Sequence, residues 1–187
     1  VAAAEAEGST VWLFHVDKVF VKTGIVGAAE SAEELAKFVP EPAYVHTVAD
    51  LETALAADRT LEVVAVLPNA DAAAPRLRRA LAAAGASAGV DVLSLAPDPI
   101  VSMKASGVDK ASALRRLCEH LGVDSEGVVA FGDGGNDVPM LRFAGRGVAM
   151  ANAGERARAA ADVVSAWSNR EDAVGRELLR LRAEGSI

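Results

Sequence analysis

The sequence predicts an α/β protein made of a partial, doubly wound (Rossmann-like) parallel sheet and a separate α+β domain. In the second part of the chain, β-branched runs alternate with helical runs across short links, which is typical of a parallel sheet covered by helices. In the first part, short strands come in hairpin-like pairs, as in a small α+β domain. A length of 187 residues allows two such parts. We expect the α+β domain over residues 1–103 and the partial sheet over residues 104–187.

Capping residues mark the helices of the first part. Ser31, with Glu34 three residues later, forms a capping-box pattern. Asp50 can cap the run LETALAA that follows it, and Asp71 begins an alanine-rich helix that ends at Gly85. Apolar or β-branched runs predict strands at 11–15, 19–22, 43–46, 62–67, 90–95 and 99–103. The first two of these runs flank a short turn and predict a hairpin.

An amphipathic helix opens the second part. Leu114, Leu117, Cys118 and Leu121 stand at positions i, i+3, i+4 and i+7, and Gly122 ends the helix. Further strands are expected at 127–131, 147–150 and 161–166, and further helices at 136–145, 155–161 and 171–184. This strict alternation predicts one half of a doubly wound sheet.

Charge and composition argue against some classes of partner. The formal net charge is −7 and the pI is near 5.0, which disfavours a nucleic acid or a membrane surface. A phosphorylated substrate is compatible with this negative charge, because a bound metal and a few local cations reverse the sign of the electrostatic field in a cleft. Cys118 is the single cysteine of the sequence, so no internal disulfide forms and a cytoplasmic location is expected. No apolar stretch approaches the roughly 20 residues of a membrane span.

The stretch FGDGGNDVPM, residues 131–140, carries the strongest chemical signal. Asp133 and Asp137 stand four residues apart around two glycines, directly after an apolar strand. Two carboxylates this close repel each other unless a cation lies between them. The loop follows the carboxyl end of a strand, where α/β sheets bind ligands, and Mg²⁺ suits one or two carboxylates together with a phosphate oxygen. The alternative is an ordinary strand-to-helix loop in which Asp137 favours the helix N-terminus through its dipole.

Four short motifs occur in one order along the second part: GVDK at 107–110, GDGGND at 132–137, GVAMANA at 147–153 and NRED at 169–172. Together they resemble the haloacid dehalogenase-like (HAD) hydrolases, in particular the Cof-type phosphatases with a large α+β cap. The resemblance implies a HAD core at 104–187 and a cap at 1–103. It also implies a Mg²⁺-dependent phosphoric monoester hydrolase that works through an aspartyl-phosphate. The implied substrate is a small phosphorylated metabolite such as a sugar phosphate.

The same resemblance implies roles for five residues. Asp133 and Asp137 are the metal residues, Asp137 by supporting the metal or its waters. Asn136 and Asn152 face the phosphate, and Lys110 pairs with the nucleophile and with phosphoryl oxygens as a point charge. The plainer alternatives are a solvated lysine before a helix for Lys110 and a turn residue for Asn152.

One part of the family pattern is missing from this sequence. The nucleophile of such enzymes lies in an N-terminal DxDGT motif, which is absent here. The nearest string, LFHVDKVF at 13–20, would put His15 in place of the nucleophile and leave too little chain for the rest of the core, so we interpret it as a cap hairpin. We expect a truncated chain whose nucleophile lies upstream and which is inactive alone. A missing N-terminal segment or a homodimer is expected to cover the exposed half sheet.

The sequence leaves two other functions to compare with this one. The first is a catalytically inactive fragment or binding module that keeps the metal and phosphate site without the nucleophile. The second is a P-type ion pump, which carries a string similar to NDVPML but also needs membrane helices and a DKTGT site that this sequence lacks. The histidines His15, His46 and His120 show no metal-ligand spacing and are expected to be structural or at the surface.

Overall fold

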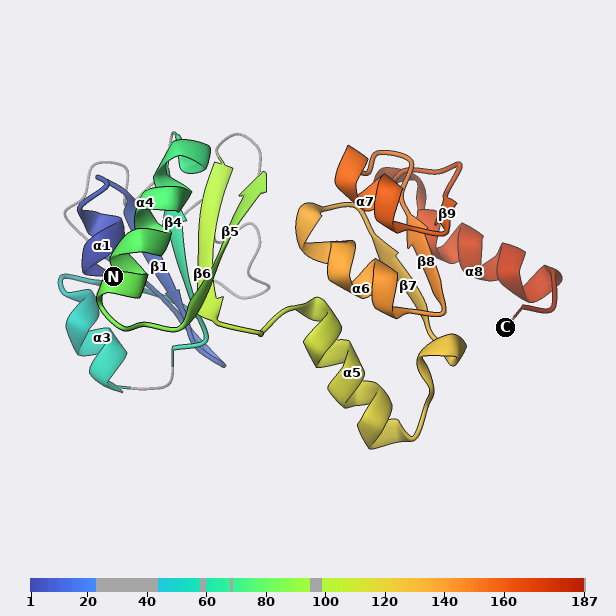
Figure 1. The fold of residues 1–187 in the computed structure, drawn as a ribbon, viewed down its shortest axis with the longest axis horizontal. Coiled ribbons are helices and arrows are strands. Elements are labelled where there is room, and N and C mark those ends of the chain that lie inside the picture. The colour runs from blue at the N-terminus through green and yellow to red at the C-terminus, as the bar shows by residue number, and fades with distance from the viewer. Residues whose placement is uncertain (23–43, 58–59, 68, 95–98, 187) are drawn as a thin grey trace. The chain divides into compact units, whose positions relative to one another are not determined.

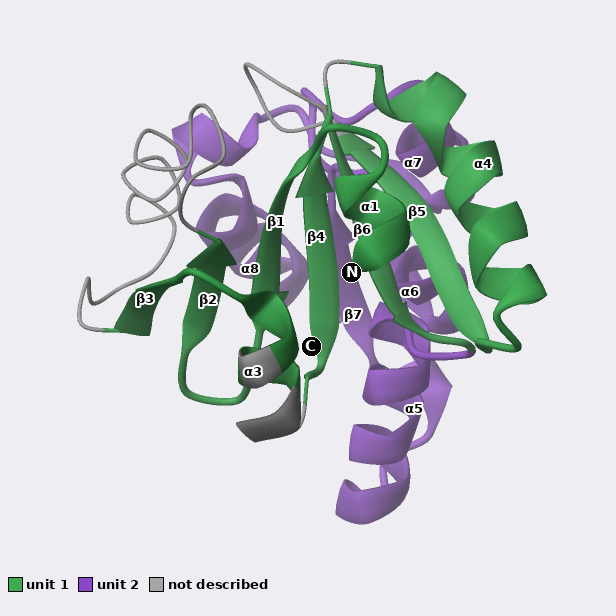
Figure 2. Ribbon diagram, turned by 90° about the vertical axis from the view of Figure 1, so that its left-hand side faces the viewer, with its two compact units in different colours: residues 1–106 green, residues 107–187 purple. Residues whose placement is uncertain are grey.

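The computed structural model describes residues 1–22, 44–57, 60–67, 69–94 and 99–186 (Figure 1). The chain divides into two compact units, residues 1–106 and residues 107–187, which Figure 2 shows in different colours. The boundary expected at 103/104 falls inside strand β6 (Pro99–Ala105), and the observed division follows the end of that strand. The helix predicted from Ser31 lies outside the described residues.

Unit 1 contains a six-stranded sheet in the order β3-β2-β1-β4-β6-β5. Besides β6, its strands are β1 (Thr10–Phe14), β2 (Val19–Lys22), β3 (Val45–Val48), β4 (Glu62–Val66) and β5 (Ala88–Ser94). Neighbouring strands are antiparallel except β2 and β3, which are parallel. The hairpin predicted at the start of the chain is confirmed, with Phe14 of β1 opposite Val19 of β2.

Helices cover one face of this sheet. They are α1 (Ala2–Glu5), α3 (Leu51–Ala57) and α4 (Ala70–Ala83). Val11 and Leu13 alternate along β1 toward that side and join a buried core with Leu77 of α4. The cap predicted for α3 is present, because the backbone N–H of Glu52 donates to Asp50 Oδ1 at 2.9 Å.

Unit 2 contains a parallel three-stranded sheet in the order β7-β8-β9. The strands are β7 (Val129–Gly132), β8 (Arg146–Ala149) and β9 (Val163–Val164). All three run the same way, so their carboxyl ends meet at one edge of the sheet. This edge positions the candidate site.

Four α-helices and three 3₁₀ turns accompany these strands within the described residues: α5 (Lys110–Leu121), α6 (Val138–Phe143), α7 (Glu155–Ala160), α8 (Ala173–Ala183), η2 (Ser125–Gly127), η3 (Gly135–Asp137) and η4 (Asn169–Glu171). The core forms where Leu141 of α6 and Ala157 of α7 meet Ala149 of β8. Helix α5 forms where its periodicity predicts, but only part of its apolar face is packed. Cys118 is buried, whereas Leu117 is 51% and Leu121 62% exposed.

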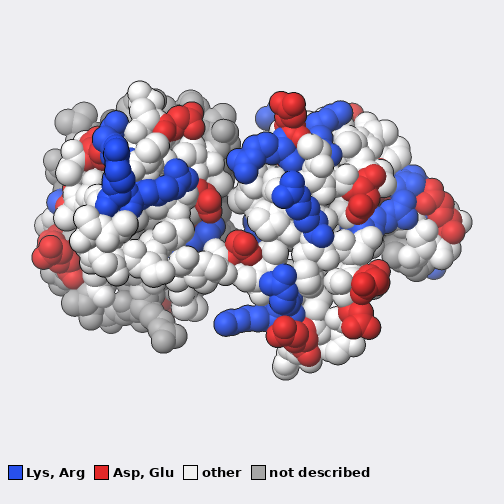
Figure 3. All heavy atoms as spheres, in the orientation of Figure 1, with Lys and Arg blue, Asp and Glu red and all other residues white. Residues whose placement is uncertain are grey.

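The surface of unit 2 carries charges of both signs. The face of unit 2 shown in Figure 3 bears Lys and Arg side chains as well as Asp and Glu side chains. In the described ranges, no helix has the length and apolar character needed to cross a membrane.

Candidate metal and phosphate site of unit 2

Polar side chains gather where the three parallel strands of unit 2 end. Asp133 directly follows β7, Asn152 follows β8 by three residues, and Asn169 follows β9 by five. Because parallel strands present their carboxyl ends at one edge, these residues come together although they are far apart in the sequence. Lys110, the first residue of α5, reaches the same loop.

Asp137 is a buried carboxylate whose two oxygens are both engaged. Lys110 Nζ donates to Oδ1, and the backbone N–H groups of Asp133 and Gly134 each donate to Oδ2 at 2.9 Å. Burial alone would raise the pKa of Asp137. The hydrogen bond from Lys110 and the two backbone hydrogen bonds outweigh that effect and hold the pKa below its ordinary value. Asp137 is therefore an anion that fixes the loop and the lysine.

The close approach of Asp137 to the strand end requires a glycine at position 132. A Cβ on Gly132 would lie 2.5 Å from Asp137 Cβ, well inside van der Waals contact. The loop also turns at once through the short η3 helix, which directs the backbone N–H groups of Asp133 and Gly134 at the carboxylate. The glycines of GDGGND thus allow this compact arrangement.

Asp133 is held on one side and open on the other. Its Oδ2 accepts a hydrogen bond from Asn169 Nδ2 at 2.8 Å and a longer one from Asn152 Nδ2 at 3.3 Å. Among the residues that the structure describes, none donates to Oδ1. The residue is only partly buried, so this oxygen is available to a ligand.

The position of Lys110 is fixed by the helix it begins. Asp109 caps α5 through its Oδ1, which accepts from the backbone N–H of Ser112 at 2.7 Å, and Ser112 Oγ accepts from the backbone N–H of Asp109 at 2.9 Å. The Lys110 side chain is 49% exposed and ion-pairs with Asp137. Its ammonium carries three donors, so one contact with Asp137 leaves others for a phosphate oxygen.

Asn136 is brought near the site without joining its hydrogen bonds. It lies in η3, and its Oδ1 is 2.7 Å from the place where a Cβ on Gly134 would stand. Within the described part of the chain, its side chain makes no hydrogen bond to Asp133, Asp137 or Lys110. The phosphate role of Asn136 stays a prediction.

Asn169 is the site residue that the motif interpretation missed. The NRED motif contributes to the family resemblance, but the resemblance implies no role for its asparagine. The sequence signal for Asn169 is its position shortly after a predicted strand, because open α/β sheets bind ligands at the carboxyl ends of their strands.

The donor set fits a hard divalent cation in part. Carboxylate oxygen is the ligand type that Mg²⁺ prefers, and Asp133 Oδ1 is open. Asp137 offers no free oxygen, so its contacts favour the supporting role expected for it over direct ligation. Nowhere in the described residues do three or more His, Cys, Asp or Glu side chains gather in a group that could hold a metal. In the described part of this loop, Asp133 Oδ1 is therefore the carboxylate oxygen left open to a cation.

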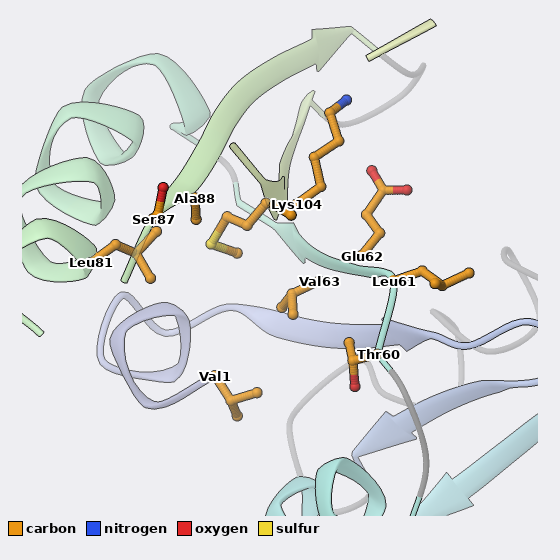
Figure 4. Close-up of a pocket in the computed structure, with 11 residues that line it drawn as sticks. Val1, Thr60, Leu61, Glu62, Val63, Leu81, Ser87, Ala88 and Lys104 are labelled. Atoms are coloured by element: carbon orange, nitrogen blue, oxygen red, sulfur yellow. The ribbon is translucent and has the colours of Figure 1, made fainter. Parts of the chain in front are cut away.

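A separate cavity of about 210 Å³ lies in unit 1 (Figure 4). Val63, Leu81 and Met103 give it an apolar lining. The two charged residues at its rim are already engaged, Glu62 with the Ser102 hydroxyl and Lys104 with a carboxylate oxygen of Asp91 at 3.3 Å. None of the predicted site residues lines this cavity.

Comparison with known families decides the assignment. The sequence profile of the haloacid dehalogenase-like hydrolases matches residues 1–178. This chain belongs to that family. The match confirms the resemblance inferred from the four motifs, and with it the assignment to a family of hydrolases. The matched range begins at residue 1, so the family profile covers unit 1 as well as most of unit 2.

The curated relatives of this HAD chain include phosphatases. A phosphoglycolate phosphatase of Methanopyrus kandleri is 51% identical over 69 residues, which are 37% of this chain and 30% of that protein. A 5-amino-6-(5-phospho-D-ribitylamino)uracil phosphatase of Escherichia coli is 52% identical over 65 residues, 35% of this chain and 24% of that protein. The chain thus matches less than a third of the length of either relative.

Solved structures share the fold over almost the whole chain. A sugar phosphatase of HAD subclass IIB superposes with a TM-score of 0.70 and 24% identity, covering 100% of this chain and 64% of that one. A protein of Streptococcus mutans superposes with a TM-score of 0.77 and 23% identity, covering 94% and 62%. These similarities confirm the predicted α/β fold class.

Proposed function

We propose that unit 2 supplies the metal and phosphate part of a Mg²⁺-dependent phosphatase that acts on a small phosphorylated metabolite. The observation that carries this proposal is the pairing of an open carboxylate, Asp133, with an anchored cation, Lys110, at the carboxyl edge of a parallel sheet. Family membership and the phosphatase names of the curated relatives support it.

Each side chain has a distinct task in this proposal. Asp133 would hold Mg²⁺ through its open oxygen, and the ion would neutralise charge on the phosphoryl oxygens. Lys110 donates hydrogen bonds to the nucleophile and to a phosphoryl oxygen, and Asp137 keeps its ammonium in place. Asn136 and Asn152 face the phosphate, and Asn152 also donates to Asp133 Oδ2.

The nucleophile comes from outside these 187 residues, because the sequence contains no DxDGT motif. An aspartate of a preceding segment attacks phosphorus, the bond from phosphorus to the ester oxygen breaks, and that oxygen takes a proton from water and leaves as the alcohol. Water then hydrolyses the aspartyl-phosphate to inorganic phosphate and regenerates the carboxylate. On this proposal the 187-residue chain does not turn over by itself.

We propose unit 1 as the cap that selects the substrate by covering the reaction site. The named relatives act on phosphoglycolate, on a ribitylamino-uracil phosphate and on sugar phosphates, all of them small phosphate compounds. A sugar phosphate or a similarly small metabolite is therefore the substrate class to screen first.

The exposed apolar side chains of unit 2 fit the same proposal. Leu117 and Leu121 of α5 and Leu179 of α8 are all more than half exposed. We propose that the preceding segment, or a second copy of the chain, covers them.

A second candidate function is favoured by one observation, the absence of the nucleophile motif. In that case the chain is an inactive module that binds metal and phosphate. The two functions are separated by extending the protein with the coding sequence upstream of Val1 and assaying p-nitrophenyl phosphate hydrolysis with Mg²⁺. The phosphatase proposal expects turnover by the extended protein and none by the 187-residue chain. Robust turnover by the shorter chain would show that the nucleophile is already present.

A further inference from the structure

We propose that Asn169 is a positioning residue that holds the Asp133 carboxylate in the orientation that presents Oδ1 to a divalent cation. This inference rests on the proposed function, because it deepens the role of the same site. It concerns a residue of the late loop after β9, to which neither the motifs nor the family match gives a role.

The contact itself is direct and short. Asn169 Nδ2 lies 2.8 Å from Asp133 Oδ2, whereas the second amide donor, Asn152 Nδ2, lies 3.3 Å away and is near the limit of a hydrogen bond. A carboxylate with one oxygen held by an amide keeps the other directed outward. Partners of this kind orient metal ligands and account for much of their affinity.

The loop that carries Asn169 is fixed by contacts of its backbone. The backbone N–H of Asn169 donates to Asn152 Oδ1 at 2.9 Å, and the carbonyl of Trp167 accepts from the backbone N–H of Ala151 at 3.0 Å. Both contacts attach the loop to the segment after β8. They do not use the Asn169 side chain, so its amide is free to serve Asp133.

The loop is also closed on itself. Ser168 donates its hydroxyl to Glu171 Oε2 at 2.6 Å, and its backbone N–H donates to the same oxygen at 3.0 Å. The side-chain hydrogen bond from Ser168, followed by the backbone one, lowers the pKa of Glu171. Glu171 therefore stays charged at neutral pH and keeps the turn closed around Asn169.

An unusual backbone conformation joins this loop to α8. Asp172 has φ +55°, and in the described ranges it is the one non-glycine residue with a positive φ. A Cβ on Gly175 would lie 2.8 Å from Asp172 Oδ2, so a side chain at this position would require the Asp172 carboxylate to turn aside. Left-handed conformations outside glycine cost free energy and concentrate at functional sites. Here Asp172 lies between η4, which ends at Glu171, and the start of α8. Leu181 of α8 is buried, so the loop is joined to a packed helix.

The test separates the amide contact from the stability of the loop. Asn169→Ala removes the donor to Asp133 but leaves the backbone contact with Asn152, and Asn169→Asp replaces the donor by a second negative charge. Arg170→Ala is the matched control, because it changes the next residue of the same turn. Asn152→Asp keeps the acceptor for the Asn169 backbone, but it replaces the longer donor by a carboxylate oxygen and so adds a negative charge beside Asp133.

Mn²⁺ is the probe, because it takes the same oxygen ligands as Mg²⁺ and broadens nearby NMR signals even when it binds weakly. The backbone amides of Gly134 and Asn152 are followed in the 187-residue chain. In the wild type, Mn²⁺ is expected to broaden them, and Asp133→Asn is expected to remove the effect. Asn169→Ala is expected to need about tenfold more Mn²⁺ for the same broadening. Arg170→Ala is expected to match the wild type.

A readout without metal tests the contact itself. The side-chain NH₂ resonances of Asn169 are expected to shift in Asp133→Ala and to stay in place in Arg170→Ala. If they do not respond to Asp133, the contact is absent and the inference fails. If they respond but Asn169→Ala binds Mn²⁺ like the wild type, the inference fails and the proposed function stands. Absence of local broadening in the wild type overturns the metal assignment of the proposed function, and the role of Asn169 with it.

Discussion

Asp133 and Asp137 lie in one loop, but different contacts hold them. Asp137 is 4% exposed and accepts hydrogen bonds from Lys110 and from two backbone N–H groups. Asp133 is partly exposed and uses one oxygen for two side-chain amides. One carboxylate therefore organises the site, and the other is left open toward a ligand.

The ion pair between Lys110 and Asp137 should contribute to the stability of unit 2. Lys110→Met is expected to lower the free energy of unfolding by about 1 kcal/mol, because Asp137 loses a charged donor but keeps two backbone donors, and because solvent screens the half-exposed lysine. Urea unfolding measures the change. Arg116→Met, at an exposed position on the same helix, is the control and should differ little from the wild type. Equal stability of the two variants would argue against a structural role for the pair.

Asp137 also predicts a dependence of stability on pH. Its pKa is lower in the folded protein than the value of about 3.9 expected in the unfolded chain. The charged form therefore stabilises the fold above that pH, and the contribution disappears as the pH falls through the folded-state pKa. Asp137→Asn lacks this contribution at every pH. The difference in melting temperature between wild type and Asp137→Asn should be large at pH 7 and smaller near pH 3. A difference that does not change with pH would contradict the assignment.

At the scale of elements, the parallel sheet determines which side chains meet. Strands of four residues or fewer are long enough to bring the site residues together, because β7, β8 and β9 are in register and end at one edge of the sheet. The loops after these strands then supply Asp133, Asn152 and Asn169. Helix α5 adds Lys110 because its capping box fixes where the helix begins.

Much of this arrangement could be predicted from the sequence, and the missing parts have physical reasons. The β-branched runs, the cap of α3, and the apolar periodicity and final glycine of α5 are local signals, so the sequence predicts those elements within a few residues, whereas the capping box at Asp109 was not predicted. The engagement of both Asp137 oxygens was not foreseeable, because two of its donors are backbone groups whose direction depends on η3. The contact of Asn169 with Asp133 joins residues 36 apart and depends on the fold of the η4 loop.

The exposed face of α5 predicts how the chain behaves in solution. Leu117 and Leu121 are expected to drive self-association of the 187-residue chain, because apolar area in water favours burial. The double variant Leu117→Lys, Leu121→Lys should sediment as a smaller species than the wild type at the same concentration. Leu55→Lys, at a less exposed leucine of unit 1, is the control. A wild-type chain that sediments as a clean monomer at high concentration would contradict this prediction.

At the scale of the whole molecule, the chain combines an α+β unit with a parallel α/β unit that bears the candidate site. The HAD profile spans both units, and the two solved structures that share the fold are longer than the chain by about a third or more of their own length. Unit 2 provides an open carboxylate and an anchored lysine, and the sequence lacks the nucleophile motif of the family. The proposed activity thus requires a further segment of polypeptide.

The most direct test is the Mg²⁺-dependent phosphatase activity of the protein extended upstream of Val1, compared with its Asp133→Asn variant. The account predicts that the extended protein hydrolyses small phosphate esters and that Asp133→Asn lowers kcat/KM by more than about 100-fold, since even the outer partners of a metal ligand are worth 10–100-fold. Retention of full Mg²⁺-dependent activity by Asp133→Asn would contradict the assignment of the site.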